Sequence, residues 1–161
     1  MSIAAKSREM FRVLGEAVSV VPALGYQLAG DDDTASLGSL FEDTVSKYPH
    51  NTMLICENRQ WTYSEFNGEV NQLARVLASS GVSRGDTVAL FMENRADYVL
   101  SMLALVKVGA SASLVNNSLS GDALVHCLKA THARGCVVGA ECSDVFAEVI
   151  GQLGWGEGQP I

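Results

Sequence analysis

The chain contains 161 residues, of which 48% are hydrophobic and 18% are charged. This composition is ordinary for a globular protein, and the length is that of about one domain with a sizeable core. The formal net charge of −7 argues against a general nucleic-acid binder, because such a protein needs a basic face to meet phosphates. We therefore expect no nucleic acid among the partners.

The four cysteines show neither a CxxC pair nor a spacing typical of a metal site: Cys56, Cys127, Cys136 and Cys142. Each lies in an apolar context, where an unpaired cysteine commonly acts as a small hydrophobic residue. We interpret them as core residues rather than as metal-binding or redox groups. Since no disulfide framework is recognisable, a reducing cytosol is the expected compartment and the expected localisation is cytoplasmic.

Residues 1–35 are expected to form an N-terminal apolar helix followed by an acidic linker. The apolar run of residues 13–28 contains Glu16 and Pro22, so it is too short and too mixed for a membrane span. One interpretation is an interfacial helix, which would bring residues 8–28 into peripheral contact with the inner face of a membrane. The favoured interpretation is a helix that packs on its own protein.

Residues 36–48 are expected to form a helix with one buried stripe at helical spacing: Leu37, Leu40, Phe41, Thr44, Val45 and Tyr48. Residues 52–56 and 59–62 predict a β-hairpin. Thr62-Tyr63-Ser64-Glu65 is a capping box, in which a hydroxyl and a carboxylate satisfy exposed amides at a helix start. The helix that it opens ends at Gly81 and carries an inward face: Phe66, Val70, Leu73, Ala74, Leu77 and Ala78.

The central stretch predicts a turn, a strand, a helix and a second strand, which make a βαβ unit with a parallel sheet. Residues 87–91 are a continuous apolar run, as expected for a strand buried on both faces. Asn94 is predicted to cap the helix of residues 96–108, which is apolar on nearly every side and ends at Gly109. Residues 110–115 are predicted to form a second buried strand.

Beyond this unit, Ser120 is predicted to cap a helix with an inward apolar side: Ala123, Leu124, Cys127 and Leu128. Residues 136–138 predict a third strand, and Ser143 or Glu141 opens a last helix with four apolar positions: Val145, Phe146, Val149 and Ile150. Residues 151–161 form a Gly-rich tail without periodicity, which we interpret as the expected point of truncation.

The expected fold is α/β: a helix and a β-hairpin, followed by alternating β-α units that form a mainly parallel sheet with helices on both faces. Ligand crevices in such sheets lie beyond the carboxyl ends of the strands. Three segments occupy that position: residues 92–94, 116–118 and 139–141. Their polar candidates are Glu93, Asn94, Asn116 and Asn117, for which capping and loop hydrogen bonding is the favoured interpretation.

No other motif assigns a site. The chain contains no Gly-x-x-x-x-Gly-Lys-Ser/Thr loop, and no Gly-x-Gly-x-x-Gly follows a predicted strand. The histidines form no cluster, and His126 and Cys127 point in different directions because they are adjacent in a helix: His50, His126 and His132. The residues therefore assign no catalytic, cofactor-binding or metal-binding side chain.

Six segments occur in an order typical of one superfamily: LGSLFE (37–42), YP (48–49), WTYSEF (61–66), GVSRGDTVA (81–89), NRADY (94–98) and LALVKVGA (103–110). They resemble the start of the adenylate-forming enzymes, the AMP-binding superfamily of acyl- and aryl-CoA synthetases. Three further segments are closest to its very-long-chain acyl-CoA synthetase and fatty-acid transport protein branch: MENR (92–95), NNSL (116–119) and LVHCLK (124–129). The resemblance covers residues 36–150, which we expect to be the N-terminal subdomain of such an enzyme.

This resemblance implies a fatty-acid–CoA ligase. The intact protein would activate a long- or very-long-chain fatty acid with ATP and Mg to an acyl-adenylate, and would then transfer the acyl group to CoA. The phosphate loop of the family, its Thr-Glu magnesium motif, its ribose-binding Asp and its catalytic Lys are not found in this sequence. The 161-residue chain is therefore expected to be an inactive N-terminal fragment without its own cofactor site, and to self-associate through exposed apolar surface.

Two alternatives stay open. The chain could be a complete short interaction module without catalytic activity. The intact protein could also be a CoA ligase for another acid class, such as a sterol side-chain, bile-type or aryl acid.

Overall fold

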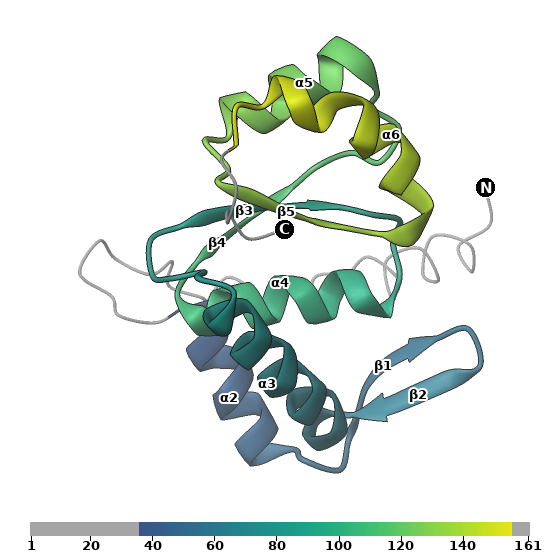
Figure 1. Ribbon diagram of the computed structural model, residues 1–161. Helices are drawn as coiled ribbons and strands as arrows, with labels where there is room; N and C mark the ends of the chain where they lie inside the picture. Colours follow the sequence, from purple (N-terminus) through teal and green to yellow (C-terminus); the bar gives the residue numbers. More distant parts are fainter. Residues whose placement is uncertain (1–35, 156–161) are drawn as a thin grey trace, which may run out of the picture. The chain divides into compact units, whose positions relative to one another are not determined.

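A computed structural model describes residues 36–155 (Figure 1). The predicted N-terminal helix and acidic linker, the predicted membrane contact through residues 8–28 and the last part of the Gly-rich tail lie outside these residues. Within residues 36–155, none of the helices has the length and apolarity that are needed to cross a membrane.

Helix α2 (Leu37–Lys47) begins at a serine cap and follows the predicted boundaries closely. The Ser39 amide donates to Ser36 Oγ at 3.1 Å, and the Ser36 amide donates to Ser39 Oγ at 2.8 Å. The prediction of one buried stripe on this helix is wrong, because only Phe41 of that set is fully buried and three members are about half exposed: Leu37, Leu40 and Tyr48. Packing against α3 and α4 covers only a narrow strip of the helix.

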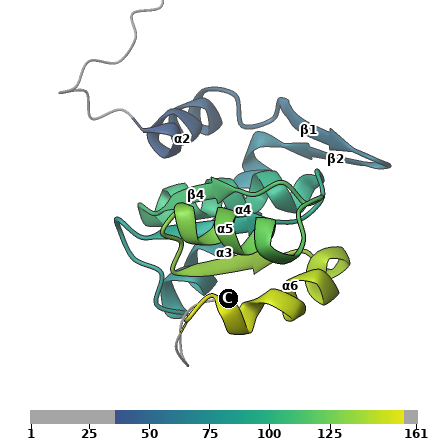
Figure 2. The same ribbon diagram turned by 90° about the horizontal axis from the view of Figure 1, so that it is seen from above.

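The hairpin prediction is confirmed by strands β1 (Thr52–Cys56) and β2 (Arg59–Thr62), which pair antiparallel. Figures 1 and 2 both show this hairpin apart from the parallel sheet, and Figure 1 shows it beside α3. Trp61 anchors it, since its ring is buried and meets Phe66 of α3 edge-on with centroids 6.0 Å apart. Edge-to-face aromatic packing of this kind adds to the burial energy.

Helix α3 (Tyr63–Ser79) starts at the predicted capping box, which is confirmed. The Glu65 amide donates to Thr62 Oγ1 at 3.3 Å, and the Thr62 amide donates to Glu65 Oε2 at 2.8 Å. The Thr62 amide and hydroxyl, with a smaller contribution from Arg59, lower the pKa of the Glu65 carboxyl. The buried residues of α3 belong to the predicted inward face: Phe66, Val70 and Leu77.

The predicted α/β class is confirmed by a three-stranded parallel sheet in the order β4-β3-β5. Its strands are β3 (Thr87–Phe91), β4 (Ser111–Leu114) and β5 (Gly135–Val138). In Figure 1, α4 (Ala96–Val108) lies on one face of the sheet, whereas α5 (Gly121–Ala130) and α6 (Ser143–Val149) lie on the other.

The pleat of β3 divides the core into two clusters. Val88 and Leu90 pack with α3, α4 and the hairpin, whereas Ala89 and Phe91 pack with α5 and α6. Alternate side chains of a strand point to opposite faces, so β3 contributes to both clusters. Its four apolar residues are almost fully buried, as the sequence predicts.

The second strand differs from the prediction. Residues 110–115 were expected to be buried, but β4 pairs with β3 alone and forms an edge of the described sheet. Leu114 is 53% exposed as a result. An apolar run does not reveal whether a strand has a second neighbour, which explains the error.

Two predicted helix caps differ from the structure, since neither of the predicted side chains makes a capping hydrogen bond. Asn94 does not cap α4, because the N-cap position is Arg95, whose side chain makes no capping hydrogen bond. Ser120 holds the N-cap position of α5, also without a side-chain hydrogen bond. The predicted end at Gly109 is confirmed by its left-handed conformation with φ of 85°, which glycine adopts without steric cost.

The beginning of the predicted tail is folded rather than irregular. Residues Ile150–Gln152 form a 3-10 helix, Leu153 is buried, and the Trp155 ring lies 6.1 Å from the Phe146 ring, centroid to centroid. The sequence prediction was wrong for this part because its apolar residues are too few to show a period.

Candidate functional site

The carboxyl ends of the three parallel strands meet at one edge of the sheet. The chain leaves β3 through α4 to reach β4 on one side, and then returns through α5 to β5 on the other side of β3. The connections thus run to opposite sides of β3, and the switch point of the sheet lies between β3 and β5. In open α/β sheets, such a switch point is where ligand crevices form.

At this position the loops that follow β3 and β5 are joined by one carboxylate. Glu141 Oε1 accepts a hydrogen bond of 2.7 Å from the Glu93 amide, and Glu141 Oε2 pairs with an Arg95 guanidinium nitrogen at 3.0 Å. Arg95 also pairs with Asp97 at 3.0 Å. We call these four residues the Glu141 cluster: Glu93, Arg95, Asp97 and Glu141. Two of the three segments predicted at the strand ends are thus brought together.

The electrostatics of the cluster keep Glu141 ionised. The Glu93 amide has the largest effect, followed by the backbone amide of Glu141 itself and the charge of Arg95, and together they hold the pKa of this carboxyl below its usual range. A general acid needs the opposite, a raised pKa that keeps its proton near neutral pH. This environment favours the ionised form of Glu141 and does not suit a general acid.

Gly139 permits the close approach of the two loops. Its amide donates to the Phe91 carbonyl at 2.9 Å. A Cβ at this position would overlap the Glu141 carboxylate and would lie 2.6 Å from the Met92 Cβ. Glycine is thus required here by a close contact between loops, at a position that the sequence had marked only as a strand end.

The other predicted candidates have local roles. Asn116 Oδ1 accepts a hydrogen bond of 2.9 Å from the Ser118 amide, which turns the chain after β4. This confirms the favoured interpretation of loop hydrogen bonding for Asn116. Asn117 is exposed, and Asn94 lies at the edge of a groove beside the hairpin.

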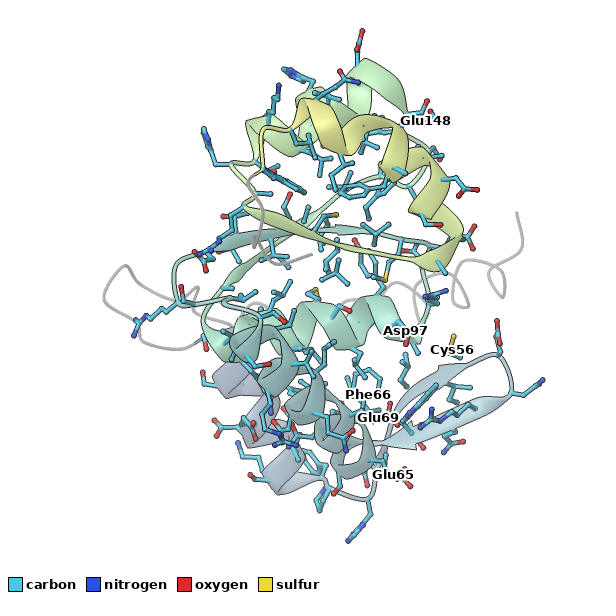
Figure 3. The ribbon with its side chains drawn as sticks, in the orientation of Figure 1. Cys56, Glu65, Phe66, Glu69, Asp97 and Glu148 are labelled. Carbon is cyan, nitrogen blue, oxygen red and sulfur yellow. The ribbon has the colours of Figure 1, made fainter. Side chains whose placement is uncertain are left out.

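Two grooves lie between the hairpin and the start of α4. One of about 500 Å³ has charged walls that include Glu57, Arg59 and Arg95. The other, of about 260 Å³, is more apolar and includes Ile55 and Val99. Cys56 and Arg95 contribute to both grooves, and Figure 3 shows Cys56 and Asp97 on this side of the molecule.

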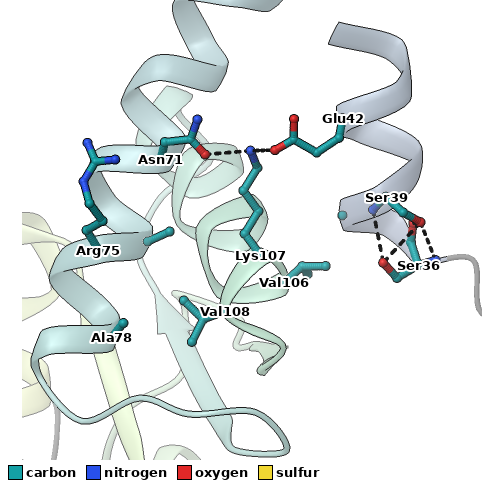
Figure 4. Close-up of a pocket in the computed structure, with 11 residues that line it drawn as sticks. Ser36, Ser39, Glu42, Asn71, Arg75, Ala78, Val106, Lys107 and Val108 are labelled. Carbon is teal, nitrogen blue, oxygen red and sulfur yellow. Dashed lines mark hydrogen bonds and ion pairs between the residues drawn. The ribbon is translucent and has the colours of Figure 1, made fainter. Parts of the chain in front are cut away.

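A third groove of about 620 Å³ lies among α2, α3 and α4 (Figure 4). Two cations line it, Arg75 and Lys107. The Lys107 side chain is only 10% exposed and pairs with Glu42 of α2. Lys107 also donates to Asn67 and, at 2.8 Å, to Asn71, both on α3. Because each donor direction meets an acceptor, Lys107 joins three helices and is not available to a ligand.

The cysteines and histidines show no reactive arrangement in the described residues. Burial raises the pKa of the Cys136 thiol to about 12, and Cys142 is shifted in the same direction. Both are buried, which confirms their interpretation as core residues. His126 is exposed on α5. In residues 36–155, no group of three or more His, Cys, Asp or Glu side chains is placed to hold a metal ion.

A model of the AMP-binding enzyme family matches residues 41–154. The chain belongs to this family. The match confirms the resemblance to adenylate-forming enzymes, and it includes every described strand together with the Glu141 cluster.

Relatives and solved structures agree with this assignment. The medium/long-chain-fatty-acid–CoA ligase FadD6 of Mycobacterium tuberculosis is 34% identical over 140 residues, which cover 86% of this chain and 24% of that protein. The long-chain fatty acid transport protein 1 of Bos taurus is 31% identical over 121 residues, which cover 74% of this chain and 19% of that protein. This chain therefore spans a quarter or less of these curated relatives.

Among solved structures, the N-terminal subdomain of Klebsiella oxytoca NpsA in complex with 3-hydroxyanthranilyl-AMSN has a TM-score of 0.64 and 29% identity, covering 70% of this chain and 28% of that chain. The N-terminal position that the resemblance implied therefore has a structural counterpart, and the helix, hairpin and parallel sheet of this chain match part of such a subdomain.

Sequence reasoning missed the Arg95–Glu141 pair and the contacts of Lys107. The first pair joins loops 46 residues apart in the sequence, and no local pattern links them. Lys107 carried a usable signal, because it is the one basic residue of the largely apolar helix α4, and a charge that is buried there needs a partner.

Proposed function

We propose that this chain supplies the N-terminal subdomain of a fatty-acid–CoA ligase that forms AMP. The observation that carries the proposal is the 34% identity to a medium/long-chain-fatty-acid–CoA ligase over 86% of the chain. The acid would be a long- or very-long-chain fatty acid, and ATP, Mg and CoA would be the other reactants. A cytoplasmic location, with or without peripheral membrane contact, is part of the same proposal.

The proposed reaction has two steps. An oxygen of the fatty-acid carboxylate attacks the α-phosphorus of ATP, and pyrophosphate leaves. The CoA thiolate then attacks the acyl carbonyl carbon, and AMP leaves. Both steps need cations and oriented amides around the transferred groups. Lys107, Arg95 and Arg59 are paired with carboxylates, which supports the scaffolding role that we propose for residues 36–155.

Exposed apolar side chains support a role as part of a larger assembly. Leu37 and Leu40 of α2, Ile55 of the hairpin and Leu114 of the edge strand are each 49% to 67% exposed. Apolar surface of this kind favours association. We propose that further parts of the ligase cover it, and that the 161-residue chain self-associates when they are absent.

The test begins with the coding DNA beyond the codon for Ile161. The complete reading frame and the 161-residue chain are then purified and assayed for ATP–pyrophosphate exchange with palmitate or with 3-hydroxyanthranilate. We expect palmitate-dependent exchange by the complete protein and none by the shorter chain.

Three outcomes would overturn parts of the proposal. Exchange by the shorter chain alone would refute the scaffolding role. Exchange with the aryl acid only would replace the fatty-acid proposal by an aryl–CoA ligase. A stop codon directly after Ile161 would favour the short interaction module.

A further inference from the structure

We propose that Glu141 is a positioning residue that fixes the loop after β3 to the loop after β5 and thereby sets the position of Arg95 in the grooves beside the hairpin. This inference goes beyond the ligase function and does not depend on it. It concerns a connection between two parts of the molecule: the crevice position at the sheet edge, and the grooves between the hairpin and α4.

The first argument is that Glu141 uses its two oxygens for two different purposes. Oε1 accepts from the backbone amide of Glu93, at 2.7 Å, and so fixes the path of the main chain. Oε2 pairs with Arg95 at 3.0 Å and so fixes a side chain. Hydrogen bonds to an ionised acceptor are stronger than neutral ones, and a carboxylate with both oxygens engaged has one favoured orientation.

The second argument is the position of Arg95. It lies at the N-cap of α4, where its own side chain makes no capping bond. Its guanidinium instead bridges Glu141 and Asp97, each at 3.0 Å. Arg95 lines both grooves beside the hairpin. The orientation that Glu141 imposes on Arg95 therefore sets the position of the Arg95 guanidinium in these grooves.

The third argument is that backbone contacts hold the loop after β3 against the loop after β5. Gly139 allows the Glu141 carboxylate to lie over the backbone, in space that a Cβ would fill. The Gly139 amide bonds to the Phe91 carbonyl, and the Cys142 amide bonds to the Gly139 carbonyl, both at 2.9 Å. The turn that presents Glu141 is therefore held independently of the Glu141 side chain, so a substitution at Glu141 removes the contact without unfolding the turn.

Several charged groups surround the ion pair between Glu141 and Arg95. One guanidinium faces two carboxylates, from Asp97 and Glu141. Burial, and then the charges of Glu141 and Glu93, raise the pKa of the Cys142 thiol. On the hairpin side, Glu57 and Arg59 line the same groove as Arg95. Removing the charge of Glu141 leaves Asp97 as the remaining ion-pair partner of Arg95 in the cluster, so Arg95 should turn toward it.

The test uses the whole 161-residue chain at neutral pH and the variants Glu141→Gln and Glu148→Gln. Both substitutions remove one negative charge, but Glu148 lies on α6, on the far side of the sheet from the hairpin (Figure 3). Backbone and Arg side-chain resonances are recorded by NMR, together with amide hydrogen exchange.

We expect Glu141→Gln to move the Glu93 amide and Arg95 Nε–H resonances and to speed exchange of the Glu93 amide about tenfold. Glu148→Gln should leave all three unchanged. A third variant, Glu141→Asp, keeps the charge on a shorter side chain, and it should retain the Arg95 resonance position better than Glu141→Gln does.

Unchanged Glu93 and Arg95 signals in Glu141→Gln would overturn the proposal, as would changes of equal size in Glu148→Gln. If Glu141→Gln lost its dispersed spectrum altogether, Glu141→Asp would decide in its place: faster exchange of the Glu93 amide than in the parent chain would support the proposal, and unchanged exchange would overturn it. None of these readouts involves catalysis. The positioning role of Glu141 can therefore be refuted while the proposed ligase function stands, and the ligase function can be refuted while the positioning role stands.

Discussion

Asp86 joins the amino ends of the sheet strands, and its replacement by asparagine offers a direct test of how the parallel sheet is held. Its carboxylate accepts from the Ser83 amide at 2.7 Å and from the Ser83 hydroxyl at 2.9 Å. It also pairs with Arg134, just before β5, at 2.9 Å and 3.0 Å. The Asp86 carbonyl accepts from the Ser111 amide of β4. One residue therefore contacts the starts of two neighbouring strands.

The expected cost of Asp86→Asn follows from these contacts. Hydrogen bonds to a charged group contribute about 1.5 to 3 kcal/mol each when they are buried. The side chains of Asp86 and Arg134 are 16% and 38% exposed, so solvent weakens the ion pair. Asparagine keeps one acceptor oxygen but loses the charge. We therefore expect the free energy of unfolding to fall by about 2 kcal/mol.

The pH dependence gives this prediction a definite sign. The Ser83 amide, and then Arg134, lower the pKa of Asp86 in the folded chain. Its charged form thus stabilises the fold above the unfolded-state pKa of about 3.9, and this contribution disappears as the pH falls through the folded-state value. The difference between Asp86→Asn and the parent chain should be largest at neutral pH and should shrink at about pH 3.

Urea unfolding followed by circular dichroism measures both quantities, and an unchanged slope shows that the unfolded state is comparable. Asp43→Asn is the matched control, because it removes the same charge from an exposed position on α2 and should change stability by less than about 0.5 kcal/mol. Equal stability of Asp86→Asn and Asp43→Asn at neutral pH would refute the reasoning, and so would a cost that stays constant into acid.

Three further predictions concern other contacts. Thr62→Ala removes the capping box of α3 and should lower the free energy of unfolding by about 1 kcal/mol in the same urea assay; no change would mean that other groups satisfy the amides. Lys107→Met leaves the Glu42 carboxylate and two Asn side chains of α3 without their shared donor, and should cost about 2 kcal/mol, with Lys47→Met as an exposed control. Leu37→Ser combined with Leu40→Ser should shift the chain toward the monomer in analytical ultracentrifugation, and a parent chain that is strictly monomeric at high concentration would contradict the premise.

The amino-acid sequence by itself determined the parts of this protein that depend on neighbours along the chain. The capping box at Thr62, the left-handed end of α4 at Gly109 and the turn at Asp86 are local arrangements of backbone and side chain. The continuous apolar run of β3 likewise predicted a strand that is buried on both faces. These features need no information about distant residues, because the groups that stabilise them lie within a few positions.

At the candidate site, the sequence could mark only positions. It placed Glu93 and Glu141 at strand ends, since parallel strands present their carboxyl ends at one edge. It did not show that the Glu141 carboxylate binds the Glu93 amide and Arg95, because the register of β3 and β5 brings these loops together. Such a contact joins residues that are far apart in the chain, so it can be identified only once the folded sheet has brought the two loops together.

Tertiary structure alone also decided which apolar faces are covered. Leu37 and Leu40 are spaced to lie on one face of a helix, as the buried residues of α3 are, yet they are exposed. The sequence of β4 is that of a buried strand, but β4 forms an edge of the described sheet. Hydrophobic periodicity reveals that a face is apolar, not which element packs on it. Burial depends on the neighbour that the rest of the fold supplies, and that neighbour is a property of the three-dimensional arrangement rather than of the segment itself.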